Sequence, residues 1–337
     1  MTNILVTGSE GYIGSVLTPK LIKRGYVVKG LDICYFQNPK KLKRNYSLIK
    51  KDIRQIENVD LSFFDAIIHL AALSNDPMGE LNPKLTEKIN YKSTIELARQ
   101  AKKQGVKRFL FASSCSIYGI ASKEVDENSP VNPITAYAKS KILSEKALLK
   151  MADKKFTVGI LRNSTVYGYS PQLRNDLVVN NFVTCALATN KIEIKSDGSP
   201  WRPLIDVRDL SDIFIEFLDA ESDKINKKVF NIGFQENNVQ IKEVLEATRR
   251  AIPACEIVFS NKHGSDTRSY QVNFERFKKI FPKIKQKWTI EKSIFDLIKN
   301  IKKQNKEKDF YSDKFSRMAT IKKLTTTGKL DKNLYWR

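Results

Sequence analysis

The chain has 337 residues, of which 41% are hydrophobic and 28% charged, so it can bury a core and is not disordered as a whole. Its 59 lysines and arginines against 37 acidic residues give a net charge of +22, which invites a nucleic-acid or membrane-surface function. However, 44 of the 59 basic residues are lysines, whereas recognition of nucleic-acid bases favours the bidentate fork of arginine. The positive charge is also uneven, because the last 62 residues hold 19 basic residues against six acidic ones. We therefore expect a solvated basic surface, with neither nucleic acid nor a membrane as partner.

Composition argues against three further classes. No apolar run approaches the roughly 18 residues that a membrane span needs. The segment MTNILVTGSEGYIGS lacks the basic and long apolar stretches of a signal peptide. The four cysteines (Cys34, Cys115, Cys185 and Cys255) show no CxxC spacing, and there are only two histidines. We expect reduced thiols in a cytoplasmic protein and no bound metal.

Strands and helices alternate through the first half of the chain. Residues 3–7 predict a short β-branched strand, and residues 13–24 predict a helix with apolar side chains three and four positions apart. Further strands are expected at 26–31, 64–70, 108–112 and 157–161, and further helices at 83–104 and 136–151. Such alternation is typical of a parallel sheet with helices on both faces, so we predict a Rossmann-type doubly wound α/β fold.

The second half is less regular. Its patterns predict helices at 177–189 and 241–251, an extended segment at 191–194, a strand running into a helix at 205–218, and a buried strand at 229–232. We expect a first domain of residues 1–167 plus about 204–233, and a smaller C-terminal α/β domain of residues 168–203 and 234–337. Apolar residues at helical spacing between 315 and 324 predict a last helix that packs on the second domain.

A glycine-rich turn, TGSEGYIG at 7–14, joins the first predicted strand to the first predicted helix. Gly8, Gly11 and Gly14 would let a diphosphate approach the backbone at the helix N-terminus. The spacing of the three glycines alone also fits an ordinary turn. The prediction of dinucleotide binding therefore depends on the position of this turn between a strand and a helix. Asp32 ends the second strand, where a carboxylate accepts hydrogen bonds from both adenosine-ribose hydroxyls and repels a 2′-phosphate. No arginine follows Asp32 directly, which favours NAD over NADP.

A second cluster points to proton and hydride chemistry. Tyr137 and Lys141 lie four residues apart on one face of a predicted helix, although YxxxK by itself also fits a solvated helix face. Ser114 lies at the carboxyl end of a predicted strand, the edge where open α/β sheets bind ligands. A phenol has an ordinary pKa near ~10, which a neighbouring ammonium and the nicotinamide of NAD⁺ both lower. We expect Tyr137 to take a proton from a sugar hydroxyl, Ser114 to hold the reacting oxygen, and Lys141 to bind the nicotinamide ribose.

Together these motifs resemble the extended short-chain dehydrogenase/reductases, specifically the NAD-dependent nucleotide-sugar epimerase/dehydratase family, and are closest to UDP-glucose 4-epimerase-like enzymes. The resemblance covers about residues 1–300 and includes HLAA at 69–72, SSCSIYG at 113–119, YAKSK at 137–141, LRNSTVYG at 161–168 and WRPLID at 201–206. It implies NAD as the cofactor, a nucleotide-diphosphate sugar as the substrate, and a homodimer formed through the helices at 83–104 and 136–151.

The resemblance also implies which residues form the two binding sites. The cofactor-binding residues would be Gly8, Gly11, Tyr12, Ile13, Gly14, Asp32, Asp52, Ile53, Leu70, Ala71, Ala72, Asn90, Tyr137 and Lys141. The substrate-binding residues would be Ser114, Thr165, Asn181, Arg202, Arg268 and Tyr270. Arg202 and Asn181 match residues that meet the substrate diphosphate, whereas Thr165 stands where the family often has asparagine. The alternative for each is a surface residue or a structural ion pair.

The two residues after Ser114 bear on the reaction. Sugar 4,6-dehydratases carry an Asp-Glu pair there, whereas Cys115 and Ser116 make a poor acid/base pair for eliminating water. Epimerases that act at C3 and C5 carry a cysteine at the Ser116 position, and we expect Cys115 to face the core. A small hydroxyl residue at Ser116 favours a 4-epimerase. A 4-ketoreductase that takes NAD(P)H from solution and a non-catalytic RNA-binding Rossmann protein remain as alternatives.

Overall fold

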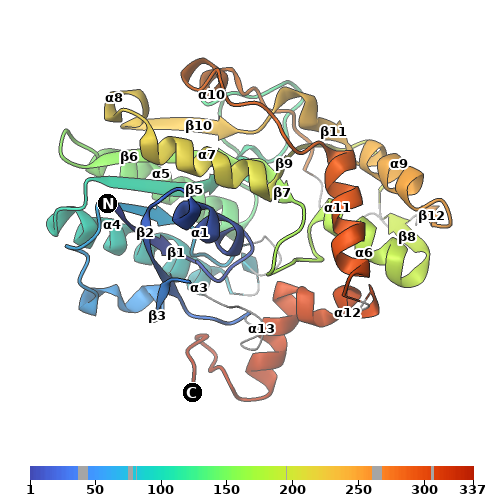
Figure 1. Cartoon of the computed structure of the whole chain (residues 1–337), viewed down its shortest axis with the longest axis horizontal. Helices are drawn as coiled ribbons and strands as arrows, with labels where there is room; N and C mark the ends of the chain where they lie inside the picture. Colours follow the sequence, from blue (N-terminus) through green and yellow to red (C-terminus); the bar gives the residue numbers. More distant parts are fainter. Residues whose placement is uncertain (37–44, 75–78, 81, 195, 260–267, 305–306) are drawn as a thin grey trace.

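The computed structural model describes residues 1–337 except 37–44, 75–78, 81, 195, 260–267 and 305–306. At its centre is a seven-stranded parallel sheet in the order β10-β6-β5-β4-β1-β2-β3 (Figure 1). The strands are β1 (Asn3–Thr7), β2 (Val27–Asp32), β3 (Ser47–Lys50), β4 (Ala66–His69), β5 (Arg108–Ser114), β6 (Thr157–Asn163) and β10 (Lys228–Ile232). The strand order reverses at β1 and β4, so the predicted Rossmann-type fold is confirmed.

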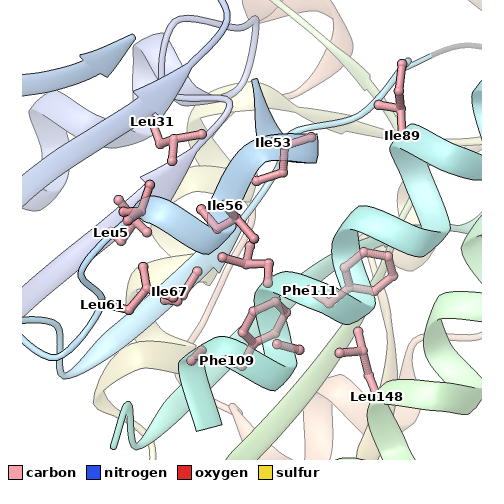
Figure 2. Close-up of a cluster of buried hydrophobic side chains, with 14 of the residues drawn as sticks. Leu5, Leu31, Ile53, Ile56, Leu61, Ile67, Ile89, Phe109, Phe111 and Leu148 are labelled. Carbon is pink, nitrogen blue, oxygen red and sulfur yellow. The ribbon is translucent and has the colours of Figure 1, made fainter. Parts of the chain in front are cut away.

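Successive residues of each strand face opposite layers of helices, as a sheet buried on both faces requires. The covering helices are α1 (Gly14–Lys23), α4 (Ser93–Lys103), α5 (Ala136–Met151) and α7 (Val207–Asp219). On one face, Leu5 and Phe109 share an apolar cluster with residues of α4 and α5 (Figure 2). On the other face, Ile4 and Leu110 cluster with residues of α1 and α7. None of the helices in the described ranges is long and apolar enough to cross a membrane.

A smaller group of elements packs beside the sheet around its own apolar cluster, which includes Phe182, Leu245 and Leu297. Its elements are β7 (Thr165–Tyr167), α6 (Val178–Thr189), β8 (Lys191–Ile194), β9 (Trp201–Asp206), β11 (Asn238–Gln240), α9 (Ile241–Ala251), β12 (Glu256–Phe259) and α11 (Ile290–Lys302). Between β9 and β11 the chain returns to the large sheet. There α7 covers one face of that sheet, and β10 pairs with β6 at the edge of that sheet.

The C-terminal segment departs from the expected packing. The predicted last helix is present as α13 (Arg317–Thr326), but Ile321, Leu330 and Leu334 are buried in the cluster beneath the large sheet rather than in the smaller group. Phe315 packs against the smaller cluster, so the segment bridges both. Figure 1 shows α13 and the C-terminus below β3, at the lower edge of the view. Helical spacing predicted the helix but could not identify the surface that it covers.

A buried ion pair fixes α5 against the sheet. Arg162 Nη2 on β6 lies 2.7 Å from Glu145 Oε2 on α5, and the two side chains are 6% and 2% exposed. The Ser113 hydroxyl also donates to the Glu145 carboxylate, and Arg162 Nη1 donates to the Tyr118 hydroxyl at 2.8 Å. Both charges are therefore hydrogen-bonded, which is the condition under which a buried ion pair is tolerated.

We expect Glu145→Ala to lower the free energy of unfolding by about 3–5 kcal/mol, because it leaves Arg162 as an uncompensated buried charge. Glu246→Ala is the matched control. Its partner Arg249 is 57% exposed and Glu246 itself 46%, and losing such a pair costs at most about 1 kcal/mol. Urea unfolding followed by circular dichroism measures both variants. A loss at Glu145 no larger than that at Glu246 would contradict the role given to the buried pair.

Candidate active site

A cleft of about 1300 Å³ runs along the carboxyl ends of the strands, where an open α/β sheet binds its ligands. Every site residue predicted from the sequence lines this cleft except Asn90. Residues as distant in the chain as Gly8, Ser114 and Arg268 are thus brought together. The cleft has room for a dinucleotide and a second ligand at once, and the individual binding roles remain predictions.

The glycine-rich turn is too crowded for side chains. Gly8 has a φ of +72°, and a Cβ there would lie 2.9 Å from the Ala71 backbone nitrogen. A Cβ on Gly14 would lie 2.2 Å from the Gly8 carbonyl oxygen, to which the Gly11 amide donates at 3.0 Å. The turn therefore presents bare backbone at the N-terminus of α1, which favours an anion. This cradle fits the diphosphate of NAD.

Asp32 stands at the end of β2, in the position expected for contact with the adenosine ribose. Its carboxylate accepts hydrogen bonds from the backbone amides of Cys34 at 2.7 Å and Glu10 at 3.0 Å. Burial raises the pKa of Asp32 to about 6, helped by the negative charge of Glu10 and opposed by the two amides. The carboxylate is mostly ionised at neutral pH and can accept hydrogen bonds from a ribose.

Asp52 also lines the cleft, where it organises the loop after β3. It caps the short helix Ile53–Asn58 by accepting from the Arg54 amide at 2.8 Å, and it forms an ion pair with the Arg54 guanidinium. The Asp52 carboxylate thus holds the wall against which adenine is expected to pack.

Asn90 is the predicted cofactor-binding residue that does not line the cleft, and it is 1% exposed. Its side-chain oxygen accepts from the Leu73 amide at 2.8 Å, and its side-chain nitrogen donates to the Leu73 carbonyl and to the Ser140 hydroxyl, both at 3.2 Å. Asn90 therefore ties the loop after β4 to α5, and its role toward the cofactor stays a prediction.

The three predicted catalytic residues come from the end of β5 and the first turns of α5, which Thr135 caps by accepting from the Ala138 amide at 3.2 Å. The Lys141 ammonium lies 5.6 Å from the centroid of the Tyr137 ring. Ser114 Oγ accepts from the Ser116 amide at 3.1 Å, which holds that hydroxyl at the cleft wall. The geometry places a hydroxyl, a phenol and an ammonium around one cleft.

Lys141 is 3% exposed, and its ammonium donates to the Ala112 carbonyl at 2.7 Å. Burial lowers the pKa of Lys141 to about 7, against the opposing effect of the Glu145 carboxylate. A group with a pKa near neutrality changes its charge readily when an ionised neighbour appears.

Cys115 and Ser116 face opposite directions. Cys115 is fully buried, its thiol donates to the Arg162 carbonyl at 3.1 Å, and burial raises its pKa far above the ordinary value, so its predicted place in the core is confirmed. Ser116 Oγ and Asn163 Oδ1 are buried atoms of cleft-lining residues, and neither has a hydrogen-bond partner within the described ranges. Sequence reasoning did not single out Asn163. Both atoms suit contact with a polar ligand.

The predicted substrate residues line the cleft from the smaller group of elements. Arg202 on β9 is 9% exposed and donates to the Trp201 carbonyl at 2.9 Å and to the Arg268 carbonyl. Asn181 on α6 donates to the Asn175 carbonyl at 2.9 Å. These backbone contacts fix the positions of the side chains, and Thr165 and Tyr270 complete this part of the wall.

Sequence reasoning also missed several charged residues of the cleft, among them Arg174, Asp176 and Arg317. Arg174 Nη2 pairs with Asp176 Oδ2 at 2.9 Å, so these two largely neutralise each other. Arg317 belongs to α13 and is 3% exposed. No motif marks any of the three, and Arg317 lies in a segment whose basic residues were all expected to face solvent.

Residues 4–233 match the model of the NAD dependent epimerase/dehydratase family. The chain is 27% identical to UDP-glucuronate 4-epimerase of Thermodesulfobacterium geofontis, over 90% of this chain and 96% of that one. It is also 27% identical to human dTDP-D-glucose 4,6-dehydratase, over 86% and 88% of the two chains. The solved UDP-glucose 4-epimerase of Thermotoga maritima superposes with a TM-score of 0.82 at 24% identity, covering 90% of this chain and 100% of that one.

The chain therefore belongs to the NAD dependent epimerase/dehydratase family. It is an enzyme of the short-chain dehydrogenase/reductase type, and its cofactor is NAD. The relatives include both 4-epimerases and 4,6-dehydratases. The choice between these reactions consequently rests on the residues of the cleft.

Lys141 gives the protein a pH-dependent stability. Its pKa is about 7 when folded against 10.5 for the free side chain, so the unfolded state binds more protons between these values. The free energy of unfolding should therefore rise with pH between about 7 and 10.5, and the contribution of Lys141 should level off below pH 7, where both states are protonated. We expect wild type to gain stability over Lys141→Met as the pH rises from about 7, measured by urea unfolding at several pH values.

The control is Lys139→Met, at an exposed position. Its free energy of unfolding should differ from that of wild type by the same amount at every pH. Parallel curves for wild type and Lys141→Met would contradict the prediction.

Proposed function

We propose that the chain is a nucleotide-sugar 4-epimerase that keeps NAD bound while it inverts C4 of the sugar. The observation that carries the proposal is that Ser114, Tyr137 and Lys141 line the same cleft as the glycine-rich turn and Asp32. A base, a hydrogen-bonding hydroxyl and a dinucleotide site in one cleft are the parts that reversible oxidation of a secondary alcohol needs.

In this reaction Tyr137 takes the proton of the C4 hydroxyl while Ser114 holds the same oxygen by a hydrogen bond. NAD, held by the glycine-rich turn and Asp32, would supply the acceptor for the C4 hydride and the donor for its return. The 4-keto sugar turns over within the cleft, and Tyr137 returns its proton to the oxygen when hydride adds to the opposite face. Lys141 in its charged form stabilises the phenolate of Tyr137.

The surroundings of Ser114 support epimerisation over dehydration. Elimination of water across C5 and C6 requires an acid and a base beside the sugar. The buried thiol of Cys115 faces away from the cleft and cannot supply either. Ser116 offers only a hydroxyl, which suits hydrogen bonding to a sugar.

For the substrate we propose a nucleotide-diphosphate sugar. Arg202 and Arg268 supply positive charge for its diphosphate, and Asn181 supplies an amide. Thr165 and Tyr270 line the same part of the cleft. The nucleotide base and the sugar are left open by these residues, so a panel of UDP, dTDP, GDP and CDP sugars is the appropriate set of probes.

We also propose a homodimer formed through α4 and α5. These helices form the outer layer on one face of the sheet, and Leu143 on α5 is 41% exposed. Light scattering at micromolar concentration should give twice the chain mass of 38.6 kDa, and Leu143→Asp should shift the value toward the monomer. A wild-type mass equal to that of one chain would refute the dimer.

The decisive experiment uses purified protein without added cofactor. We expect interconversion of a C4-epimeric pair from the panel, and Tyr137→Phe should lower kcat by about 10²–10⁴ because it removes the general base. Tyr26→Phe is the control, since Tyr26 bonds to Asp219 outside the cleft. Full turnover by Tyr137→Phe would contradict the assignment. Product that forms only when NAD(P)H is supplied with a 4-keto sugar would instead identify a 4-ketoreductase.

A further inference from the structure

The C-terminal tail, residues 314–337, is fastened to the loops that follow β2 and β3. Trp336 Nε1 donates to the Ile33 carbonyl at 2.8 Å, and Arg54 Nη1 donates to the Asn333 carbonyl at 2.6 Å. The Arg54 guanidinium also lies 3.6 Å from the centroid of the Tyr335 ring. These loops form the end of the cleft where adenosine is expected, so the tail packs against the outside of that end, and Arg317 is the tail residue that lines the cleft.

The tail carries one cation into the cleft. Ser316 caps α13 by accepting from the Ala319 amide at 3.4 Å, which makes Arg317 the first residue of the helix. Arg317 Nη2 donates to the Gln172 carbonyl at 2.9 Å, and its guanidinium lies 4.3 Å from the centroid of the Phe36 ring. Across the residues that the structure describes, no carboxylate comes within ion-pair distance of Arg317.

A buried guanidinium without a carboxylate partner is costly, and an anion in the cleft would offset that cost. Burial and the neighbouring charge of Arg174 lower the pKa of Arg317 to about 9, against the opposing effects of Asp176 and Asp32. Arg317 thus remains charged at neutral pH. The groups that act on it electrostatically include Asp32 at the ribose position and Tyr12 beside the N-terminus of α1.

We propose that Arg317, carried by the C-terminal tail, binds the diphosphate of NAD. The diphosphate joins the adenosine ribose at Asp32 to the N-terminus of α1, and Arg317 lies among the groups at these two points. The Asp32 carboxylate repels a 2′-phosphate, so the observations favour the diphosphate over the extra phosphate of NADP. The inference requires only NAD as cofactor and is independent of the proposed 4-epimerisation.

The test measures ligand binding by calorimetry on the full chain stripped of cofactor. Arg317→Gln should weaken NAD and ADP-ribose, which carry the diphosphate, at least tenfold, and adenosine less than twofold. Arg317→Lys keeps the charge and should recover part of the NAD affinity. Arg337→Ala, which removes an exposed cation from the same tail, should bind NAD like wild type.

Equal losses for adenosine and NAD would show that Arg317 only supports the wall, and would overturn the proposal. A loss confined to NADP would also overturn it by assigning Arg317 to the 2′-phosphate. If Arg317→Gln fails to fold, Arg317→Lys takes its place. A lower NAD affinity with an unchanged adenosine affinity supports the proposal, and affinities for both ligands that match wild type overturn it. Because turnover is not measured, a failure of the proposed epimerase activity leaves this result intact.

Discussion

The reactive end of the cleft depends on the ion pair between Glu145 and Arg162. Glu145 lies one helical turn after Lys141 on α5, so the face of the helix that buries the ammonium also buries the carboxylate. Arg162 belongs to β6, and Ser113, which donates to Glu145, directly precedes Ser114 at the end of β5. One network therefore ties the helix that carries the phenol and ammonium to the strand that carries the hydroxyl. The desolvation cost of these charges is met by bidentate, fully hydrogen-bonded geometry.

Features with a local cause could be read from the sequence. The helix predicted at 136–151 coincides with α5 because Thr135 caps it and its residues are mostly good helix formers, with no glycine or proline among them. The glycine-rich turn was recognisable because steric crowding allows few other residues there. By contrast, β3 was missed, since it has two exposed and two half-buried residues at the sheet edge and little alternation to detect. Asn90 lies in a π-helical turn, Lys88–Lys92, whose wider winding redirects side chains in a way that no spacing rule anticipates.

The C-terminal tail shows that the net charge of a segment does not predict which of its charged residues are buried. Most of the excess positive charge lies near the C-terminus, and the lysines of α13, Lys322 and Lys323, are exposed as expected. Arg317 at the start of the same helix is buried in the cleft. Burial here is decided by contacts with residues far away in the chain, such as Gln172. Such contacts leave no local pattern. The sequence therefore predicted the helix α13, but it predicted neither the surface against which α13 packs nor the burial of Arg317.

The distribution of charge in the cleft connects the tail to the proposed reaction. The proposed reaction requires the cleft to accept two diphosphates, one from NAD and one from the substrate, and Arg174 is already paired with Asp176. Arg202 and Arg268 lie toward the smaller group of elements, and Arg54 at the adenosine end is paired with Asp52. Arg317 is the cleft-lining guanidinium toward that end for which the described residues show no carboxylate partner. An epimerase must return the same hydride that it removed, so its cofactor has to remain bound through the cycle. A reductase must exchange its cofactor at every turnover. The tail is fastened to the loops at the adenosine end through Trp336 and Arg54, and Arg317 would add a contact that retains NAD, as the proposed epimerase requires.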